Sequence, residues 1–216
     1  MKRWLLILLC GILLFSYTGC NKNREIAVVY TDIPTEYSMG NISVTYPRLA
    51  GQVDGTKIPM VNHLIKTDIL ERVFDDSLYQ LNEVTATIQY TITLQNSSLI
   101  SLVYTGTLQA NPQSEVNRVI YTVTFDLENG QEIPFSQAVN NPDALESQIA
   151  QAAITAADGV DAAELEAYRP ALKKSDLLLQ YDQNSQYTFS MTEEGLFLSF
   201  PVPHSLGDYA TITIDN

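Results

Sequence analysis

Few residues in this sequence have the type and spacing that catalysis requires. Of the two histidines, His63 has no acidic or histidine partner at the spacing of metal ligands. His204 precedes Asp208 closely enough for a His–Asp pair, but no nucleophile accompanies that pair. The sequence contains none of the patterns G-x-S-x-G, S-x-x-K, H-E-x-x-H or G-x-x-x-x-G-K-[ST]. We therefore expect no catalytic residue, no metal site and no cofactor.

The acidic side chains include two adjacent pairs, Asp75-Asp76 and Glu193-Glu194. Neighbouring residues on a helix or turn point in different directions, so we interpret both pairs as solvated surface charge. Glycosidases use two carboxylates that come from separate elements and face one cleft. The sequence leaves such an arrangement of more distant carboxylates open.

Tyrosine is unusually frequent, with 12 residues in the chain. Tyrosines on strands usually fill half-buried sheet faces. An exposed subset could instead form a binding surface, because tyrosine combines a large apolar ring with a polar tip. The candidates that we name for such a surface are Tyr104, Tyr121 and Tyr209.

The charge balance is strongly acidic, with 12 Lys and Arg against 25 Asp and Glu and a formal net charge of −13. Phosphate groups need Lys and Arg to neutralise them, so this balance argues against a nucleic-acid partner. A basic protein would be attracted to such a surface.

Two cysteines cannot build a disulfide scaffold or a cysteine-rich zinc module. The 216 residues, 45% of them apolar, suffice for a globular body with a hydrophobic core.

The N-terminus has the layout of a secretory signal, with a basic start, an apolar stretch over 4–17 and the ending Thr18-Gly19-Cys20. The apolar stretch is shorter than the roughly 20 residues that a membrane-spanning helix needs. The Thr-Gly-Cys ending resembles that of a bacterial lipoprotein signal, although Tyr17 stands where such signals usually have leucine. We predict a signal peptide over 1–19, a lipid such as palmitate on Cys20, and a tether over 20–41. An uncleaved anchor and cleavage without lipid remain alternatives. The expected location is the bacterial cell envelope, with a lipid anchor in a membrane and the body outside the cytoplasm.

The rest of the chain predicts an α+β fold in two halves, 42–115 and 116–216, that together form one composite domain. We expect antiparallel sheets, with a long helix in the first half and one or two helices in the second half packed on them. In the first half the elements are a strand over 41–46, a helix over 60–81 and a hairpin of 84–94 with 99–108. In the second half they are a strand over 118–127, helices over 144–157 and 162–172, a hairpin of 186–192 with 196–200, and a strand over 209–214.

Short motifs follow one another in a fixed order from residue 42 to the C-terminus. They are Tyr46-Pro47-x-Leu49, Val61-Asn62, Ile100-Ser101-Leu102 with Tyr104, Thr124-Phe125-Asp126-Leu127 with Gly130, Phe189-x-Met191-Thr192-x-x-Gly195-Leu196 before Phe200-Pro201, and Tyr209-Ala210. In this order they resemble the extracytoplasmic domain shared by the lysozyme-sensing bacterial anti-sigma factor and the non-catalytic N-terminal part of peptidoglycan deacetylases. The resemblance implies an α+β envelope domain and, from the sensor, lysozyme binding. It implies neither anti-sigma activity nor deacetylation, because the motifs do not cover the parts that perform those tasks.

Two functional hypotheses follow. The first is a non-enzymatic cell-envelope lipoprotein that binds a wall component such as peptidoglycan, or a basic wall-acting protein such as lysozyme. The alternative is a carboxylate-dependent hydrolase that acts on cell-wall glycan. An open groove with two facing carboxylates of perturbed pKa would favour the second hypothesis.

Overall fold

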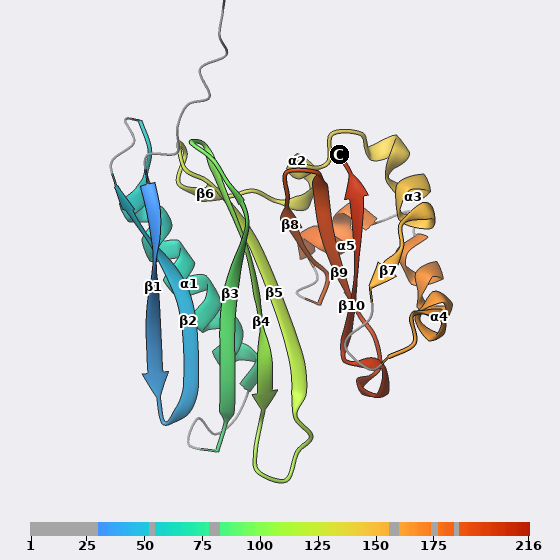
Figure 1. Ribbon diagram of the computed structural model, residues 1–216, viewed down its shortest axis with the longest axis horizontal. Helices are drawn as coiled ribbons and strands as arrows, with labels where there is room; N and C mark the ends of the chain where they lie inside the picture. Colours follow the sequence, from blue (N-terminus) through green and yellow to red (C-terminus); the bar gives the residue numbers. More distant parts are fainter. Residues whose placement is uncertain (1–29, 52–54, 78–82, 156–159, 174–176, 184–185) are drawn as a thin grey trace, which may run out of the picture.

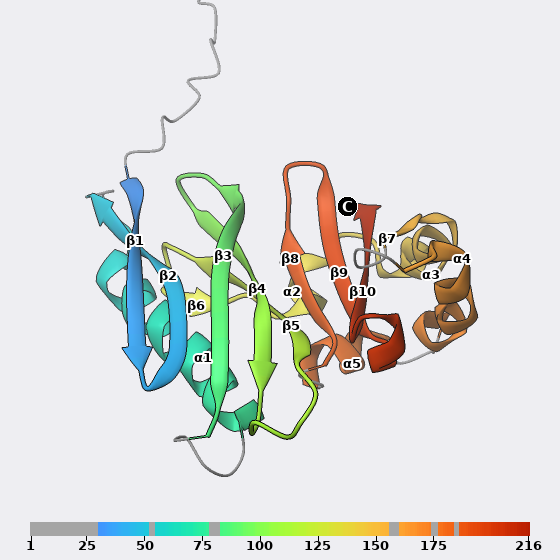
Figure 2. The same cartoon turned by 60° about the horizontal axis from the view of Figure 1, so that its bottom comes forward.

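The computed structural model in Figure 1 describes residues 30–51, 55–77, 83–155, 160–173, 177–183 and 186–216. Their strands form two sheets that stand side by side (Figures 1 and 2). The first sheet has six strands in the order β1-β2-β3-β4-β5-β6. These strands are β1 (Tyr30–Met39), β2 (Asn41–Gly51), β3 (Thr85–Gln95), β4 (Leu99–Gln109), β5 (Asn117–Asp126) and β6 (Gln131–Glu132).

Helix α1 (Ile58–Ser77) covers one face of the first sheet (Figure 1). Pro59 suits the first turn of a helix, since its missing N–H would be unpaired there in any case. Side chains four residues apart form one helical stripe, and the stripe of Val61, Ile65, Ile69 and Val73 is completely buried. Burial of each of these side chains stabilises the fold by about 1.5–3 kcal/mol. This stripe therefore fixes which face of α1 meets the sheet.

Helix α1 is also tied to β2 by the side chain of Asn62. Its Oδ1 accepts a hydrogen bond from the Leu49 N–H at 2.7 Å, and its Nδ2 donates to the Leu49 carbonyl at 2.9 Å. The helix then leads to β3, which pairs with β2 in a parallel manner, whereas the other pairs of this sheet are antiparallel. Parallel neighbours need a crossover connection, and α1 provides it.

The second sheet is antiparallel and has the order β7-β10-β9-β8. Its helices lie behind and beside it in Figure 1, and their apolar side chains form a second core with the strands. The strands are β7 (Ile154–Thr155), β8 (Thr188–Met191), β9 (Gly195–Pro201) and β10 (Tyr209–Asp215). The helices are α2 (Phe135–Ala138), α3 (Pro142–Gln151), α4 (Ala162–Leu165) and α5 (Leu177–Gln183), with 3-10 turns η1 (Glu166–Lys173) and η2 (His204–Leu206).

A seam of hydroxyl groups joins the two sheets. The Met191 N–H of β8 donates to Ser101 Oγ of β4 at 2.8 Å, and Thr122 Oγ1 of β5 donates to the Phe189 carbonyl. Strand β8 is the edge of its sheet, and an uncovered edge invites pairing with other chains. The hydroxyls of the first sheet therefore satisfy the free edge of the second. Within the described residues and apart from the tyrosines, the buried polar side chains are serines and threonines of β4, β5, β8, β9 and β10: Ser101, Thr122, Thr124, Thr188, Ser190, Ser199 and Thr211.

The structure confirms the predicted α+β class, the long helix and both hairpins. In the part that the structure describes, the second half has the four helices α2 to α5 instead of the predicted one or two, and α3 ends at Gln151, because strand β7 occupies part of the helix predicted over 144–157. Three further differences concern the strands. The first sheet is mixed, because β2 and β3 are parallel. Part of the predicted tether is strand β1, since the left-handed turn at Gly40, with φ of +60°, folds Tyr30–Met39 back along β2. The predicted strand over 118–127 is β5, which pairs with β4. The first sheet thus continues beyond the predicted division between residues 115 and 116.

The predicted signal peptide, with Cys20 and the start of the tether, lies outside the described residues. In the part of the chain that the structure describes, no helix has the length and apolar character needed to cross a membrane.

Candidate functional site

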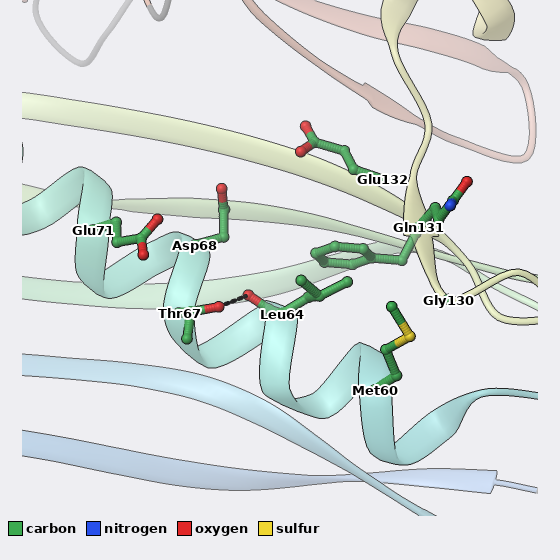
Figure 3. A pocket seen from close by; sticks show the side chains of 9 residues that line it. Met60, Leu64, Thr67, Asp68, Glu71, Gly130, Gln131 and Glu132 are labelled. Atoms are coloured by element: carbon green, nitrogen blue, oxygen red, sulfur yellow. Dashed lines mark hydrogen bonds between the residues drawn. The ribbon is translucent and has the colours of Figure 1, made fainter.

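A groove of about 400 Å³ runs between α1 and the β5–β6 hairpin (Figure 3). We call it the α1–β6 groove. One end is apolar and is formed by Met60 and Leu64, and the other end carries the carboxylates of Asp68, Glu71 and Glu132. Its lining is completed by Thr67, Phe125, Gly130 and Gln131.

The groove residues that α1 contributes lie on the helical stripe next to the buried one. Leu64 and Asp68 each precede a buried isoleucine by one position, so they lie at the edge of the helix that faces β5 and β6. The opposite wall depends on the turn between β5 and β6. Gly130 adopts the left-handed conformation there, with φ of +68°, and a Cβ at this position would lie 2.8 Å from Lys57 Cβ and 3.0 Å from Met60 Sδ. Glycine is therefore required both by the turn and by the close approach of α1.

Arg72 connects the two walls of the groove. Its Nε lies 2.9 Å from Asp68 Oδ1, one helical turn earlier, and its Nη2 lies 3.9 Å from Glu132 Oε1 on β6. The side chains of Asp68 and Arg72 are only 21% and 22% exposed. A partly buried pair of this kind is less screened by salt than a surface pair.

Asp68 and Glu132 hold protons more readily than free carboxylates do. Burial raises the pKa of Asp68, and the Arg72 guanidinium opposes this rise. Burial also raises the pKa of Glu132, assisted by the negative charge of Asp68 and opposed by Arg72. The groove thus brings together two carboxylates from separate elements, an arrangement that the sequence left open.

The three candidate tyrosines do not share an exposed face. Tyr104 and Tyr121 are buried in the core of the first sheet, 0% and 5% exposed, because their strands direct these side chains toward α1. Tyr209 is half-buried at the start of β10. Burial raises the pKa of Tyr104 far above its usual range, and the charge of Asp68 adds to the effect. Tyr104 and Tyr121 therefore belong to the core beneath the groove rather than to an exposed binding surface.

The other residues singled out in the sequence lie apart from the groove. His63 is exposed on α1. His204 does form the anticipated pair, with its Nδ1 2.8 Å from Asp208 Oδ1, and its Nε2 lies 3.6 Å from Glu115 Oε2. Glu193 and Glu194 are exposed in the β8–β9 turn, as interpreted, whereas the side chains at 75–76 lie outside the description. Among the described residues, no three His, Cys, Asp or Glu side chains are grouped so that they could hold a metal ion.

The residues that sequence reasoning missed are Asp68, Arg72 and Glu132. The spacing of Leu64, Asp68 and Arg72 by four residues was a usable signal, because it places them on one edge of the helix. Nothing in the sequence indicated that Glu132 lies opposite them.

Comparison with known proteins finds similar solved structures. No family model and no curated protein matches the sequence. A DUF3298 family protein from Pseudomonas aeruginosa PAO1 is similar in structure, with a TM-score of 0.48 and 10% identity over 88% of this chain and 92% of that chain. A member of the DUF3298 family from Bacteroides fragilis NCTC 9343 has a TM-score of 0.45 and 11% identity over 88% of this chain and 90% of that chain. Neither similarity is close enough to transfer a residue or an activity to this chain.

Proposed function

We propose that this protein is a non-enzymatic lipoprotein of the bacterial cell envelope, anchored through Cys20, that binds a basic wall-acting protein such as lysozyme. The signal-like N-terminus supports the location, and the ordered motifs that resemble the lysozyme-sensing domain support the partner. The partner approaches the α1–β6 groove and places a cationic side chain at its acidic end.

The groove is the observation that carries this proposal. Its acidic end presents Asp68, Glu71 and Glu132 to a cation, while Arg72 compensates only part of their charge. Its apolar end offers Met60, which is 50% exposed, to an apolar side chain beside that cation. Such a combination suits a lysine or arginine that is flanked by an apolar residue. The net charge of −13 would steer a basic protein toward the molecule before contact.

Calorimetric titration with lysozyme at low and moderate salt tests the proposal. The double variant Asp68→Asn, Glu71→Gln removes two carboxylates from the groove. Two partly screened charge contacts are together worth about 1–2 kcal/mol, so the Kd should rise about 5- to 30-fold. The control Glu193→Gln, Glu194→Gln removes the same charge from an exposed turn and should change the Kd by less than about 2-fold.

Two results would contradict the proposal. Absence of lysozyme binding at micromolar concentration at either salt would remove lysozyme as the partner. Equal weakening by the groove variant and by the control would show that only the overall charge matters, and not the groove.

The second candidate is a hydrolase that acts on cell-wall glycan, and it is favoured by the raised pKa values of Asp68 and Glu132 in one open groove. The position of Arg72 argues against it. A glycosidase needs room for the glycosidic bond between its two carboxylates, whereas here one guanidinium contacts both of them. Release of reducing sugars from purified peptidoglycan, abolished by Asp68→Asn or Glu132→Gln, would favour the hydrolase over the binding protein.

A further inference from the structure

Polar contacts join the loop before β10 to the loop before β5, at the same end of the two sheets (Figure 1). His204 Nε2 of the second sheet lies 3.6 Å from Glu115 Oε2 of the first sheet. The Arg118 N–H of β5 donates to Asp208 Oδ2 at 2.7 Å. Arg118 precedes Thr122 by four residues on β5, so these contacts continue the hydroxyl seam along the same strand.

The loop between β9 and β10 holds His204 and Asp208 in a fixed relation, because it is closed on itself. The Val202 N–H donates to the Asp208 carbonyl at 3.0 Å, and the Gly207 N–H donates to the His204 carbonyl at 3.0 Å. Asp208 has a φ of +73° and is the one non-glycine residue with a positive φ among the described residues. Residues with a Cβ seldom adopt this conformation, although aspartate tolerates it better than most. Asp208 is therefore positioned by its surroundings so that Oδ1 contacts His204 Nδ1 at 2.8 Å while Oδ2 reaches across to Arg118.

The two sheets depend on such polar contacts to stay together. Each sheet has its own hydrophobic core, and no described side chain belongs to both cores. Relative motion is expected between units of one chain unless a large hydrophobic interface joins them. A change in a single polar contact can therefore alter how often the seam opens.

The protonation state of His204 determines whether its ring can bind both carboxylates. A neutral imidazole has one N–H and one acceptor nitrogen, whereas the protonated ring has two N–H groups. The shorter contact is the one with Asp208, so the neutral ring places its N–H at Nδ1 and turns the lone pair of Nε2 toward Glu115. A lone pair that faces a carboxylate is repelled by it. The contact between His204 and Glu115 is therefore favourable only when the ring is protonated.

The charged groups that face His204 on balance favour its protonated form. The hydrogen bond and charge of Asp208 raise the pKa of His204 above its ordinary value of 6.5, and Glu115 adds to this rise, whereas desolvation and Arg118 oppose it. Tyr209, next to Asp208, stays neutral over this range because burial raises its pKa above 10. The contact with Glu115 should therefore be complete below pH 6.5 and be lost as the pH rises through the raised pKa of His204.

We propose that His204 and Glu115 form a pH-dependent latch between the two sheets. The latch is closed when both ring nitrogens of His204 carry a proton, and it opens when Nε2 releases its proton to water. The open latch keeps the hydrogen bond between Asp208 and Arg118, so the seam loosens without separating. The latch includes no residue that lines the α1–β6 groove, so its test is independent of lysozyme binding.

NMR titration of the full chain gives the first test. Glu115→Gln should lower the pKa of His204, because it removes the counter-charge that the first sheet supplies. The signal of the Arg118 amide should shift with the same midpoint as the His204 ring, since Asp208 connects the two groups. The matched controls are His63→Gln on α1 and Glu146→Gln on α3, which change exposed side chains and should leave the pKa of His204 unchanged.

Hydrogen exchange of the Met191 amide gives the second test, because this amide donates to Ser101 across the seam. After correction for the intrinsic exchange rate, its protection should fall about 2- to 5-fold between pH 6 and a pH above the measured pKa of His204, as is typical of the loss of an exposed ion pair. His204→Gln and Glu115→Gln should abolish this fall, whereas the two controls should retain it.

Two results would overturn the proposal. One is a Glu115→Gln variant in which the pKa of His204 and the pH dependence of Met191 protection are the same as in the unchanged protein. The other is a Met191 amide that is as well protected as the amides between β9 and β10. Equal protection would mean that the seam opens only when the whole second sheet unfolds, and no latch would then be needed to hold it.

Discussion

Gly130 lies in the turn that forms one wall of the α1–β6 groove. Its replacement by alanine has two physical effects. The first is backbone strain, because a residue with a Cβ pays about 1–2 kcal/mol in the left-handed region where Gly130 lies, with φ of +68°. The second is contact, because the new Cβ would lie 2.8 Å from Lys57 Cβ and 3.0 Å from Met60 Sδ. The Met60 side chain can rotate away, but Lys57 Cβ moves only with its backbone. Such overpacking typically costs about 1–3 kcal/mol.

Gly40→Ala is the matched control. Gly40 has nearly the same φ, +60°, but a Cβ there would meet nothing within 4 Å. We expect Gly40→Ala to lower the free energy of unfolding by about 1–2 kcal/mol and Gly130→Ala to lower it by about 2–5 kcal/mol. The assay is urea denaturation, with the slope m compared so that a change in the midpoint can be attributed to stability. Gly130→Ala should also weaken lysozyme binding, because the shifted turn carries Glu132 with it.

Equal losses in the two variants would refute this reasoning. That result would mean that α1 and the β5–β6 turn are not in close contact, so the groove would be wider than the structure shows. Loss of stability by Gly130→Ala without any effect on lysozyme binding would show that the position of Glu132 is unimportant for the partner.

Three further predictions concern titration and the seam. Burial raises the pKa of Asp68 in the folded state above its ordinary value of 3.8, so the folded state binds more protons there than the unfolded state does. The free energy of unfolding should therefore fall as the pH rises from 3.8 through the raised pKa. Asp68→Asn should flatten this fall, which is measured as urea midpoints across acidic pH. The hydrogen bond and charge of Asp208 raise the pKa of His204 above 6.5, so the stability from this pair should be complete below 6.5 and be lost as the pH rises through the raised pKa, whereas His204→Gln should show no such loss. Thr122→Val leaves the Phe189 carbonyl without its donor in the seam and should cost about 1–3 kcal/mol in denaturant unfolding, while Thr122→Ser should restore most of it.

Local periodicity was enough to predict α1 and the β3–β4 hairpin. Helix α1 shows apolar residues at helical spacing, and β3 alternates apolar and polar residues along its length. Strand β4 is a largely apolar run that follows the turn at 96–98. Their signals are strong because each element buries a continuous stripe or face of its own. For the same reason, errors in these elements are confined to a few residues at the ends.

Strand β1 was assigned to the tether because its sequence lacks such a signal. It is an edge strand in which only Tyr30 is buried, and it contains Pro34, a residue that lowers the strand prediction. The structure accommodates the proline at the edge, opposite Pro47 of β2. What holds this strand is long-range, namely its pairing with β2 and the hydrogen bond from the Tyr30 hydroxyl to the Asn96 carbonyl at 2.9 Å. Neither contact can be read from the sequence of residues 30–39.

The α1–β6 groove lies beyond local prediction for a related reason. Asp68 and Glu132 line it from separate elements, and Arg72 contacts both. Their relative position depends on which face of α1 meets the sheet and on how closely the Gly130 turn approaches the helix. The apolar stripe that begins at Val61 determines the first, and the missing side chain at Gly130 permits the second. Residues that contact no partner therefore set the distance between Asp68 and Glu132, whose carboxylates would contact one. A change in core packing should alter the groove as well.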